Sequence, residues 1–262
     1  MGWLKKGLRA AQVLAKHGWH ETCDCVLCGA SADDAGRGVL CKGCDGTLPT
    51  HPQVACPQCG IATQDAMVCG ECLADSPAFD ATVTVFTYRY PLDHLLHSFK
   101  YASNLALTGF FSARMIERVR GRGRVFPDVL MPMPLARMRL SERGFNQALL
   151  IAENVAEDLS LPLERSALQR VRETRPQTGL TWSDRRANVN GAFACSKDLT
   201  GKHVAIVDDV MTTGATVNEA AKVLKRRGAG KVTAWVIARA TKEISALGWE
   251  TGWEDGSDPP RV

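Results

Sequence analysis

Hydrophobic and polar positions follow two different periods between residues 79 and 242, and each period predicts a different kind of element. Alternating or continuously apolar runs rich in β-branched residues are typical of strands, and the continuous runs are typical of parallel strands buried on both faces. Such runs predict strands within 79–90, 127–135, 203–210 and 231–240. Apolar residues at helical spacing predict helices within 91–107, 146–160 and 217–230, the last of which ends at Gly228. Strands that alternate with helices predict an α/β domain with a parallel sheet over residues 79–242.

The two ends of the chain show a different pattern. In residues 1–22, basic residues interrupt the apolar positions and no small-residue cleavage site follows, so we do not expect a secretory signal. Leu4, Leu8 and Leu14 would share one side of a short amphipathic N-terminal helix, which fits a docking helix better than a membrane-surface helix. Residues 243–262 are polar, contain Gly and Pro, and predict a flexible tail. No apolar run approaches the length of a membrane span, and we expect a cytoplasmic protein.

Four Cys-x-x-Cys pairs distinguish residues 23–78 from the rest of the chain. They are Cys25 and Cys28, Cys41 and Cys44, Cys56 and Cys59, and Cys69 and Cys72. Each pair offers two thiolates on a tight turn, and two pairs complete a tetrahedral zinc site. Disulfides would need an oxidising compartment, and a redox Cys-x-x-Cys normally occurs once, beside a βαβ pattern. The spacing therefore predicts a double zinc ribbon with about two structural zinc ions.

The pairing within this zinc ribbon is open at the level of sequence. Sequential and alternate pairing both agree with the order of the four pairs, and Cys23 either stays spare or replaces a neighbour. The segment has too few apolar residues for a core, so the metal would supply its folding energy. Zinc ribbons serve as structural staples or as nucleic-acid adaptors, and the small number of basic residues here favours the staple.

The charge of the chain changes once the cysteines are counted as ligands. The formal net charge of +4 treats every cysteine as neutral. A zinc ion with four thiolates is a dianion, so two such sites would bring the total to about zero. The hydrophobic content of 45% and the charged content of 23% are ordinary for a globular protein, and 262 residues allow one full domain plus a small one.

Arginine is concentrated between residues 114 and 186, which hold fourteen Arg and no Lys. The planar guanidinium group binds phosphate through two parallel hydrogen bonds, whereas a lysine is a point charge. A GC-rich genome would also replace Lys with Arg, but eleven Lys elsewhere in the chain weaken that explanation. The distribution favours a phosphate-bearing ligand.

The segment 204–216, VAIVDDVMTTGAT, contains the strongest candidate site. An apolar strand ends in Asp208 and Asp209, and a loop of small and hydroxyl-bearing residues follows and opens a helix. Backbone N–H groups at such a helix start can surround a phosphate, but two carboxylates alone would repel it. A ribose 5-phosphate resolves the conflict, since its hydroxyl groups can donate to the acids and Mg²⁺ can bridge them to a pyrophosphate on carbon 1. The competing interpretation is an acidic strand end followed by a Thr-rich helix cap.

This segment resembles the phosphoribosyl pyrophosphate (PRPP) signature of type I phosphoribosyltransferases. Together with the cysteine pairs, HSFKY at 97–101, MPMPLARMRLSERGFNQA at 131–148 and RPQTGLTWSDRRANVNGAF at 175–193, it is similar to the ComF family. That family combines a double zinc ribbon with a phosphoribosyltransferase-like domain and is associated with DNA uptake and the use of external DNA. The related enzymes displace pyrophosphate from PRPP with a nitrogen nucleophile.

The resemblance implies a role for each matching residue. Asp208 and Asp209 would be catalytic, holding the ribose hydroxyls and stabilising positive charge on the ring. The 5-phosphate would be held by Thr212, Thr213, Gly214, Ala215 and Thr216. The pyrophosphate would be held by Arg137, Arg139 and Arg143, for each of which a solvated surface charge is the alternative.

The resemblance also implies a hood over the site, for which a surface loop is the alternative. Candidate contacts to the hood or the ligand are Lys100, Asn146, Gln147, Gln177, Arg185, Arg186 and Asn188, of which Asn146 and Gln147 equally suit a helix cap. The implied function is phosphoribosyl transfer from Mg²⁺-bound PRPP to an unidentified nitrogen acceptor. The alternative is a PRPP-sensing factor that binds single-stranded DNA or a DNA-processing protein, because the fold alone does not settle catalysis.

Overall fold

The computed structural model of the protein describes residues 24–32, 38–102, 104–123, 125–172 and 188–240. The expected N-terminal helix, the C-terminal tail and Cys23 therefore lie outside the described residues. The chain divides into two compact units, Met1–Gly46 and Thr47–Val262, each of which is described by itself.

The described part of the small unit is built around two cysteine-bearing turns. In the first turn the Gly29 N–H donates to the carbonyl of Cys25 at 2.8 Å, and the Cys25 N–H donates to the carbonyl of Ala30 at 2.6 Å. Gly29 has a φ of +72°, in the left-handed region that glycine adopts without strain. The second turn leads into the short helix α2 (Lys42–Gly46).

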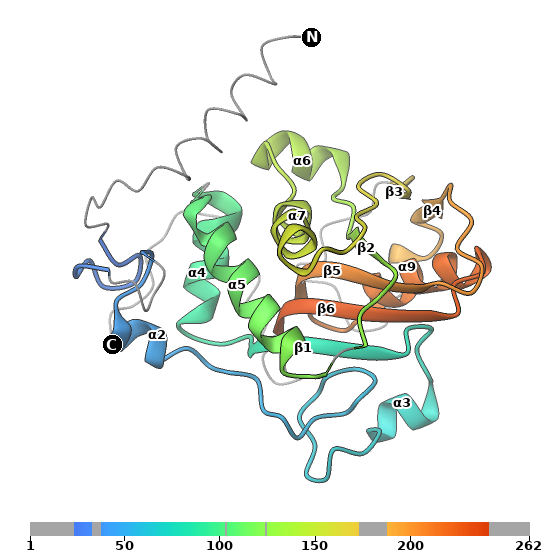
Figure 1. The fold of residues 1–262 in the computed structure, drawn as a ribbon, viewed down its shortest axis with the longest axis horizontal. Helices are drawn as coiled ribbons and strands as arrows, with labels where there is room; N and C mark the ends of the chain where they lie inside the picture. The colour runs from blue at the N-terminus through green and yellow to red at the C-terminus, as the bar shows by residue number, and fades with distance from the viewer. Residues whose placement is uncertain (1–23, 33–37, 103, 124, 173–187, 241–262) are drawn as a thin grey trace. The chain divides into compact units, whose positions relative to one another are not determined.

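The large unit contains a parallel sheet, as the strand pattern predicted. Its four strands are β1 (Ala81–Thr87), β2 (Val129–Pro132), β5 (His203–Met211) and β6 (Lys231–Arg239), in the order β1-β6-β5-β2 (Figure 1). β5 lies between β2 and β6, with Met131 opposite Ile206 and Trp235 opposite Val207. This position explains why its apolar run is buried on both faces.

Helices cover both faces of this sheet. They are α4 (Leu92–Tyr101), α5 (Ala106–Arg120), α7 (Gln147–Leu159) and α9 (Ala215–Arg226). Val204 and Ile206 of β5 belong to one core cluster with α9, whereas Ala205 and Val207 do not, as expected when successive side chains alternate between faces. Figure 1 shows α5 and α7 side by side on the face opposite α9.

The three helix predictions in the large unit hold, but its 15-residue helix α5 was missed. The apolar residues that predicted α4 are all buried, namely Leu92, Leu95, Leu96 and Phe99. The sequence pattern did not predict α5, in which Gly109 and Ser112 interrupt the apolar positions and Phe110 and Phe111 are adjacent. A short helix, α6 (Arg137–Arg143), follows β2 where a pyrophosphate-binding loop was expected.

Two smaller elements complete the large unit. The helix α3 (Gly70–Ala74) carries Cys72, and β3 (Leu168–Arg170) pairs antiparallel with β4 (Phe193–Cys195). In the described part of the chain, every helix is too short or too polar to cross a membrane.

Candidate functional site

The acid pair lies at the carboxyl edge of the parallel sheet. β5 runs through a buried stretch, Val204–Val207, and then carries Asp208 and Asp209 at partly exposed positions before it ends at Met211. Ligands of open α/β sheets bind in the crevice beyond the carboxyl ends of the strands. Asp208, Asp209 and the loop that follows them therefore lie at the edge of the sheet where ligands of such folds bind.

A lysine from another element contacts the acid pair. The Nζ atom of Lys100, in the last turn of α4, lies 3.1 Å from Oδ2 of Asp209. Lys100 was a candidate contact from the sequence, and the structure brings it to the acids across more than a hundred residues. This cation offsets part of the repulsion that the carboxylates would exert on a phosphorylated ligand.

The two carboxylates differ in their electrostatic surroundings. Burial, reinforced by the negative charge of Asp209, raises the pKa of Asp208 to about 8. The charges of Lys100 and Arg170 act in the opposite direction. Asp208 therefore holds a proton more readily than an ordinary aspartate does. A bound cation would favour its charged form.

The loop after β5 has the backbone geometry of a close-approach site. Gly214 has a φ of +77°, and a Cβ atom there would lie 2.7 Å from Cε of Met211. α9 begins at the next residue, and the hydroxyl of Thr213 accepts a hydrogen bond from the Ala215 N–H at 3.2 Å. The first turn of a helix has N–H groups without intrahelical partners, and Gly214 has no side chain with which to cap them. The hydroxyl-bearing residues Thr212, Thr213 and Thr216 are half-buried around this helix start.

A buried arginine that the sequence did not single out supports the same loop. Arg239, the last residue of β6, is 3% exposed. Its Nη1 group donates to the carbonyls of Met211 at 3.1 Å, of Ala240 at 2.8 Å and of Thr212. Its Nε group donates to the carbonyl of Cys59 at 2.8 Å. Arg239 thus joins the start of the loop after β5 to one of the cysteine turns.

The three arginines predicted to hold pyrophosphate lie on α6 and differ in their contacts. Arg137 is exposed and Arg139 is half-buried. Arg143 stacks on Tyr101, with its guanidinium carbon 4.9 Å from the ring centroid, and donates to the Tyr101 hydroxyl at 3.1 Å. Because Tyr101 follows Lys100 in the chain, Arg143 is tied to the end of α4 that contacts the acid pair.

The remaining candidate contacts differ in their surroundings. Asn146 caps α7, since its side chain accepts from the N–H groups of Ala148 and Leu149 at 3.0 and 3.4 Å. Gln147 is buried and accepts from Arg143 at 3.4 Å. The Asn188 carbonyl accepts from Arg172 at 3.0 Å. The other hood candidates lie outside the described residues, namely Gln177, Arg185 and Arg186.

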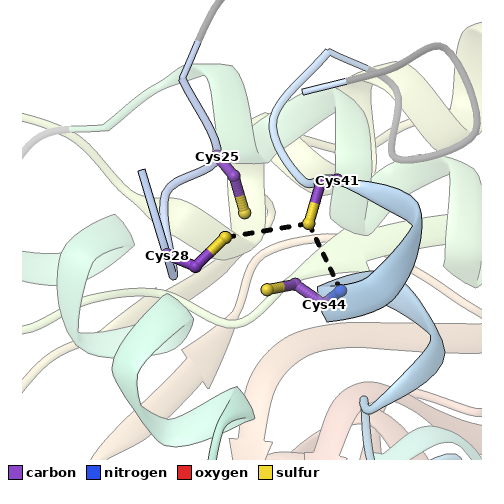
Figure 2. A group of neighbouring side chains, drawn as sticks. All are labelled: Cys25, Cys28, Cys41 and Cys44. Atoms are coloured by element: carbon purple, nitrogen blue, oxygen red, sulfur yellow. Dashed lines mark hydrogen bonds between the residues drawn. The ribbon is translucent and has the colours of Figure 1, made fainter. Parts of the chain in front are cut away.

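The eight paired cysteines form two clusters in sequential order. The first cluster is Cys25, Cys28, Cys41 and Cys44, and the second cluster is Cys56, Cys59, Cys69 and Cys72. Figure 2 shows the four side chains of the first cluster pointing toward a common centre. Alternate pairing, which the sequence left open, is therefore not what the structure shows.

Both clusters have the dimensions of a zinc site. The sulfur atoms of each cluster all lie within 4.8 Å of one another. A tetrahedral site with Zn–S bonds of about 2.3 Å separates its sulfurs by about 3.8 Å. The Cys28 and Cys41 sulfurs are 3.7 Å apart, and the Cys59 and Cys69 sulfurs are 3.6 Å apart. Four thiolates at this spacing are the donor set that structural zinc prefers.

The second cluster is part of the large unit. The Thr82 hydroxyl on β1 donates to the Gln58 carbonyl at 2.6 Å, and the Thr82 N–H donates to the Pro57 carbonyl at 3.2 Å. The Gln58 side chain in turn donates to the Phe79 carbonyl at 3.3 Å. Figure 1 shows α3 below β1, which is an edge strand of the sheet.

Comparison with known proteins agrees with this architecture. The model of the phosphoribosyl transferase domain matches residues 146–253, which include β5, the loop and α9. The purine phosphoribosyltransferase structure from Pyrococcus horikoshii is 18% identical and has a TM-score of 0.33 over 50% of this chain and 81% of that chain. The large unit thus contains a phosphoribosyltransferase-like domain, and the two cysteine clusters of a zinc-ribbon module precede the sheet of this domain in the chain.

Curated relatives match over most of their length. Competence protein F of Haemophilus influenzae is 34% identical over 224 residues, which cover 82% of this chain and 96% of that protein. The DNA utilization protein YhgH of Escherichia coli K12 is 34% identical over 78% of this chain and 92% of that protein. Competence protein ComFC of Bacillus subtilis is 28% identical over 77% of this chain and 84% of that protein. The chain therefore belongs to the ComF family.

Proposed function

We propose that this protein binds Mg²⁺-PRPP at the carboxyl edge of β5 and transfers the phosphoribosyl group to a nitrogen acceptor. One observation carries this proposal. Asp208 and Asp209 at the end of β5 lie within a few residues of the start of α9, which follows the left-handed residue Gly214. A ligand for this site needs an anionic group for the loop and hydroxyl groups for the acids. A ribose 5-phosphate has both.

The proposed binding mode assigns one part of PRPP to each element. The 5-phosphate enters the loop from Thr212 to Thr216 and accepts from the first N–H groups of α9. The ribose hydroxyls donate to Asp208 and Asp209. Lys100 forms an ion pair with Asp209 and supplies positive charge for the phosphates at this site. Arg143, held by Tyr101, is the α6 arginine best placed for the pyrophosphate, with Arg137 and Arg139 on the same helix.

The proposed chemistry uses the charge of the acid pair. As pyrophosphate leaves, positive charge develops on the ribose ring, and carboxylates fixed beside the ring stabilise it. Mg²⁺ bound with PRPP neutralises the leaving group when present. The bond from carbon 1 to the pyrophosphate oxygen breaks and leaves its electron pair on the pyrophosphate. A bond from carbon 1 to the acceptor nitrogen forms, and the acceptor N–H gives up its proton to water.

The names of the relatives favour a second candidate function. Those proteins are called competence and DNA utilization proteins, which associates them with DNA uptake or use. On this basis the second candidate is a PRPP-sensing factor that does not turn PRPP over and binds single-stranded DNA or a DNA-processing protein. It would use the same phosphate loop and acid pair.

The zinc ions belong to the proposal as well. We propose one structural zinc ion in each cysteine cluster, held by the four thiolates already brought together. The ions stabilise the turns and do not take part in the chemistry at the loop.

The decisive experiment combines binding and turnover. The purified protein is titrated with Mg²⁺-PRPP in a calorimeter and then incubated with PRPP and a panel of nitrogen bases while pyrophosphate is measured. Binding with release of pyrophosphate supports the transferase, and binding without release supports the sensor. Absence of binding overturns both.

Variants at the site make this experiment specific. Replacing both Asp208 and Asp209 with Asn removes charged hydrogen bonds worth about 1.5–3 kcal/mol each, so we expect weaker PRPP binding. A transferase should lose turnover further, by about a hundredfold or more, because the transition state is more cationic than the ground state. Gly214→Val should weaken binding, because valine is strained at a φ of +77° and its side chain would displace that of Met211 at the start of the loop. Asp158→Asn, an exposed acid on α7, is the control.

A further inference from the structure

We propose that Arg239 is a positioning residue through which the metal in the second cluster holds the phosphate loop in its binding geometry. This inference deepens the proposed function, since it concerns the loop that would bind PRPP. It makes the second cluster a structural condition for ligand binding. A cluster that stabilised only residues 56–72 would have no effect on ligand binding at the loop.

Arg239 controls the orientation of two peptide groups at the start of the loop. It donates to the carbonyls of Met211 and Thr212. In a trans peptide the carbonyl and the following N–H point in opposite directions. A guanidinium that holds these two carbonyls therefore directs the N–H groups of Thr212 and Thr213 away from itself. N–H groups held in one direction are what an anion-binding loop needs.

The same guanidinium group holds the second cluster. Its Nε group donates to the Cys59 carbonyl at 2.8 Å, and the Cys59 sulfur lies 3.6 Å from the Cys69 sulfur. The guanidinium is a rigid planar group, so the positions of its hydrogen-bond partners are coupled through it. A cysteine turn that shifts on losing its ion would displace Arg239 and with it the loop carbonyls.

Charge gives a second reason for the coupling. Arg239 is buried, and the four hydrogen bonds described above go to carbonyl oxygens, which carry no full negative charge. A buried cation without a countercharge is unfavourable. A zinc ion with four thiolates is a dianion, and the second cluster would therefore add to the negative charge of Glu71 in keeping Arg239 in place.

A second set of contacts, independent of Arg239, also connects the second cluster to the loop. Gln58 lies in the turn between Cys56 and Cys59, and its side chain donates to the Phe79 carbonyl. The Phe79 ring lies 3.8 Å from the position that a Cβ atom would take at Gly214. The neighbouring Ala78 N–H donates to Asn218 on α9 at 2.7 Å. The turn that carries Cys59 thus reaches the loop from two sides.

The test uses Arg239→Lys, which keeps the charge and loses the planar group. Arg165→Lys, at an exposed arginine paired with Glu153, is the matched control. Hydrogen exchange of the 208–216 peptide is measured in the ligand-free protein, PRPP affinity is measured by calorimetry, and zinc content is measured by metal analysis. We expect Arg239→Lys to keep its zinc, to exchange the loop amides about tenfold faster or more, and to bind PRPP about tenfold more weakly or worse, because charge-assisted hydrogen bonds to the loop are lost.

The reverse direction is tested with Cys69→Ser, which removes a ligand of the second cluster. We expect loss of one zinc ion together with faster exchange in the 208–216 peptide. If that variant does not fold, Arg239→Lys alone decides. Unchanged loop exchange and unchanged PRPP affinity in folded Arg239→Lys protein would overturn the inference. If the unaltered protein does not bind PRPP, the proposed function fails, and loop exchange still judges the role of Arg239.

Discussion

The first and the second cysteine cluster begin with turns of the same geometry. In one, Cys25 donates to Ala30 and accepts from Gly29; in the other, the Cys56 N–H donates to the Ile61 carbonyl at 2.7 Å and its carbonyl accepts from Gly60 at 2.9 Å. Gly29 and Gly60 have φ values of +72° and +73°. The local sequence therefore builds the same turn twice.

The surroundings of the two clusters differ. In the first cluster only Cys25 is buried, and Cys28 is exposed. In the second cluster Cys56, Cys59 and Cys72 are buried and pack with Ile61 and Val68. The first cluster lies in the small unit, whereas the second cluster lies in the unit that contains the sheet. The same cysteine pattern can thus stabilise a small unit by itself in one place and pack against a large domain in another.

The largest expected difference concerns loss of a ligand. Cys25→Ser and Cys56→Ser each remove the buried first cysteine of a cluster, and each should cost one zinc ion. Structural zinc contributes about 10–16 kcal/mol in zinc-finger peptides, and 1 kcal/mol shifts the melting temperature of a domain of this size by about 2–4 °C. We expect Cys56→Ser to lower the main thermal transition by more than about 10 °C, and Cys25→Ser to leave that transition in place. Equal shifts in calorimetry would contradict the difference between the clusters.

The next difference is the rate of metal release. Because Cys28 is exposed and most of the second cluster is buried, a thiol-modifying reagent should reach the first cluster earlier. We expect zinc release, followed with a colorimetric chelator, in two phases of about one ion each. Cys25→Ser should remove the fast phase and keep the slow one. A single phase in the unaltered protein would mean that burial does not separate the clusters.

A smaller effect is expected at the glycine of each turn. Alanine in the left-handed region costs about 1–2 kcal/mol at either site. At Gly29 a Cβ atom meets nothing within 4 Å, whereas at Gly60 it would lie 3.0 Å from Oγ1 of Thr84 and 3.2 Å from Cγ2 of Thr82. Overpacking of this kind adds about 1–3 kcal/mol, so Gly60→Ala should lower the unfolding free energy of the large unit in urea. Gly29→Ala should not affect that transition.

The smallest effect separates two threonines on β1. The Thr82 hydroxyl donates to the Gln58 carbonyl, whereas the buried Thr84 hydroxyl has no hydrogen-bond partner among the described residues. Thr82→Val should lower the unfolding free energy by about 1–3 kcal/mol, because it leaves a carbonyl without its donor. Thr84→Val should be neutral or stabilising. Equal losses in urea unfolding would show that the contact with Gln58 does not anchor the second cluster.

Local patterns were sufficient for much of the fold. The helical spacing of apolar residues predicted α4 and its buried side, and the continuous apolar run predicted β5 as a buried parallel strand. The α5 helix escaped because adjacent phenylalanines, a glycine and a serine obscure its period. Its helical state depends on packing against α7 and the sheet, which no local pattern records.

The candidate site divides in the same way. Asp208, Asp209 and the loop to Thr216 are contiguous, so their grouping was visible in the sequence. Arg170 was not distinguished from the other arginines between residues 114 and 186, and Arg239 gave no signal, since a single arginine resembles any surface charge. Only the structure shows that Arg239 is buried between the loop and a cysteine turn.

The sequence by itself determined the four cysteine pairs, the acid pair before a phosphate-type loop, and the alternation of strands and helices, because each depends on residues at fixed short separations. The tertiary structure alone decided which cysteine pairs share a cluster, which cluster joins the sheet, and which distant cations reach the acids and the loop. Those contacts join residues up to 180 positions apart, as between Cys59 and Arg239. At such separations, the number of residues between two positions does not determine how far apart they lie in space. The packing of the strands and helices that carry them determines that distance.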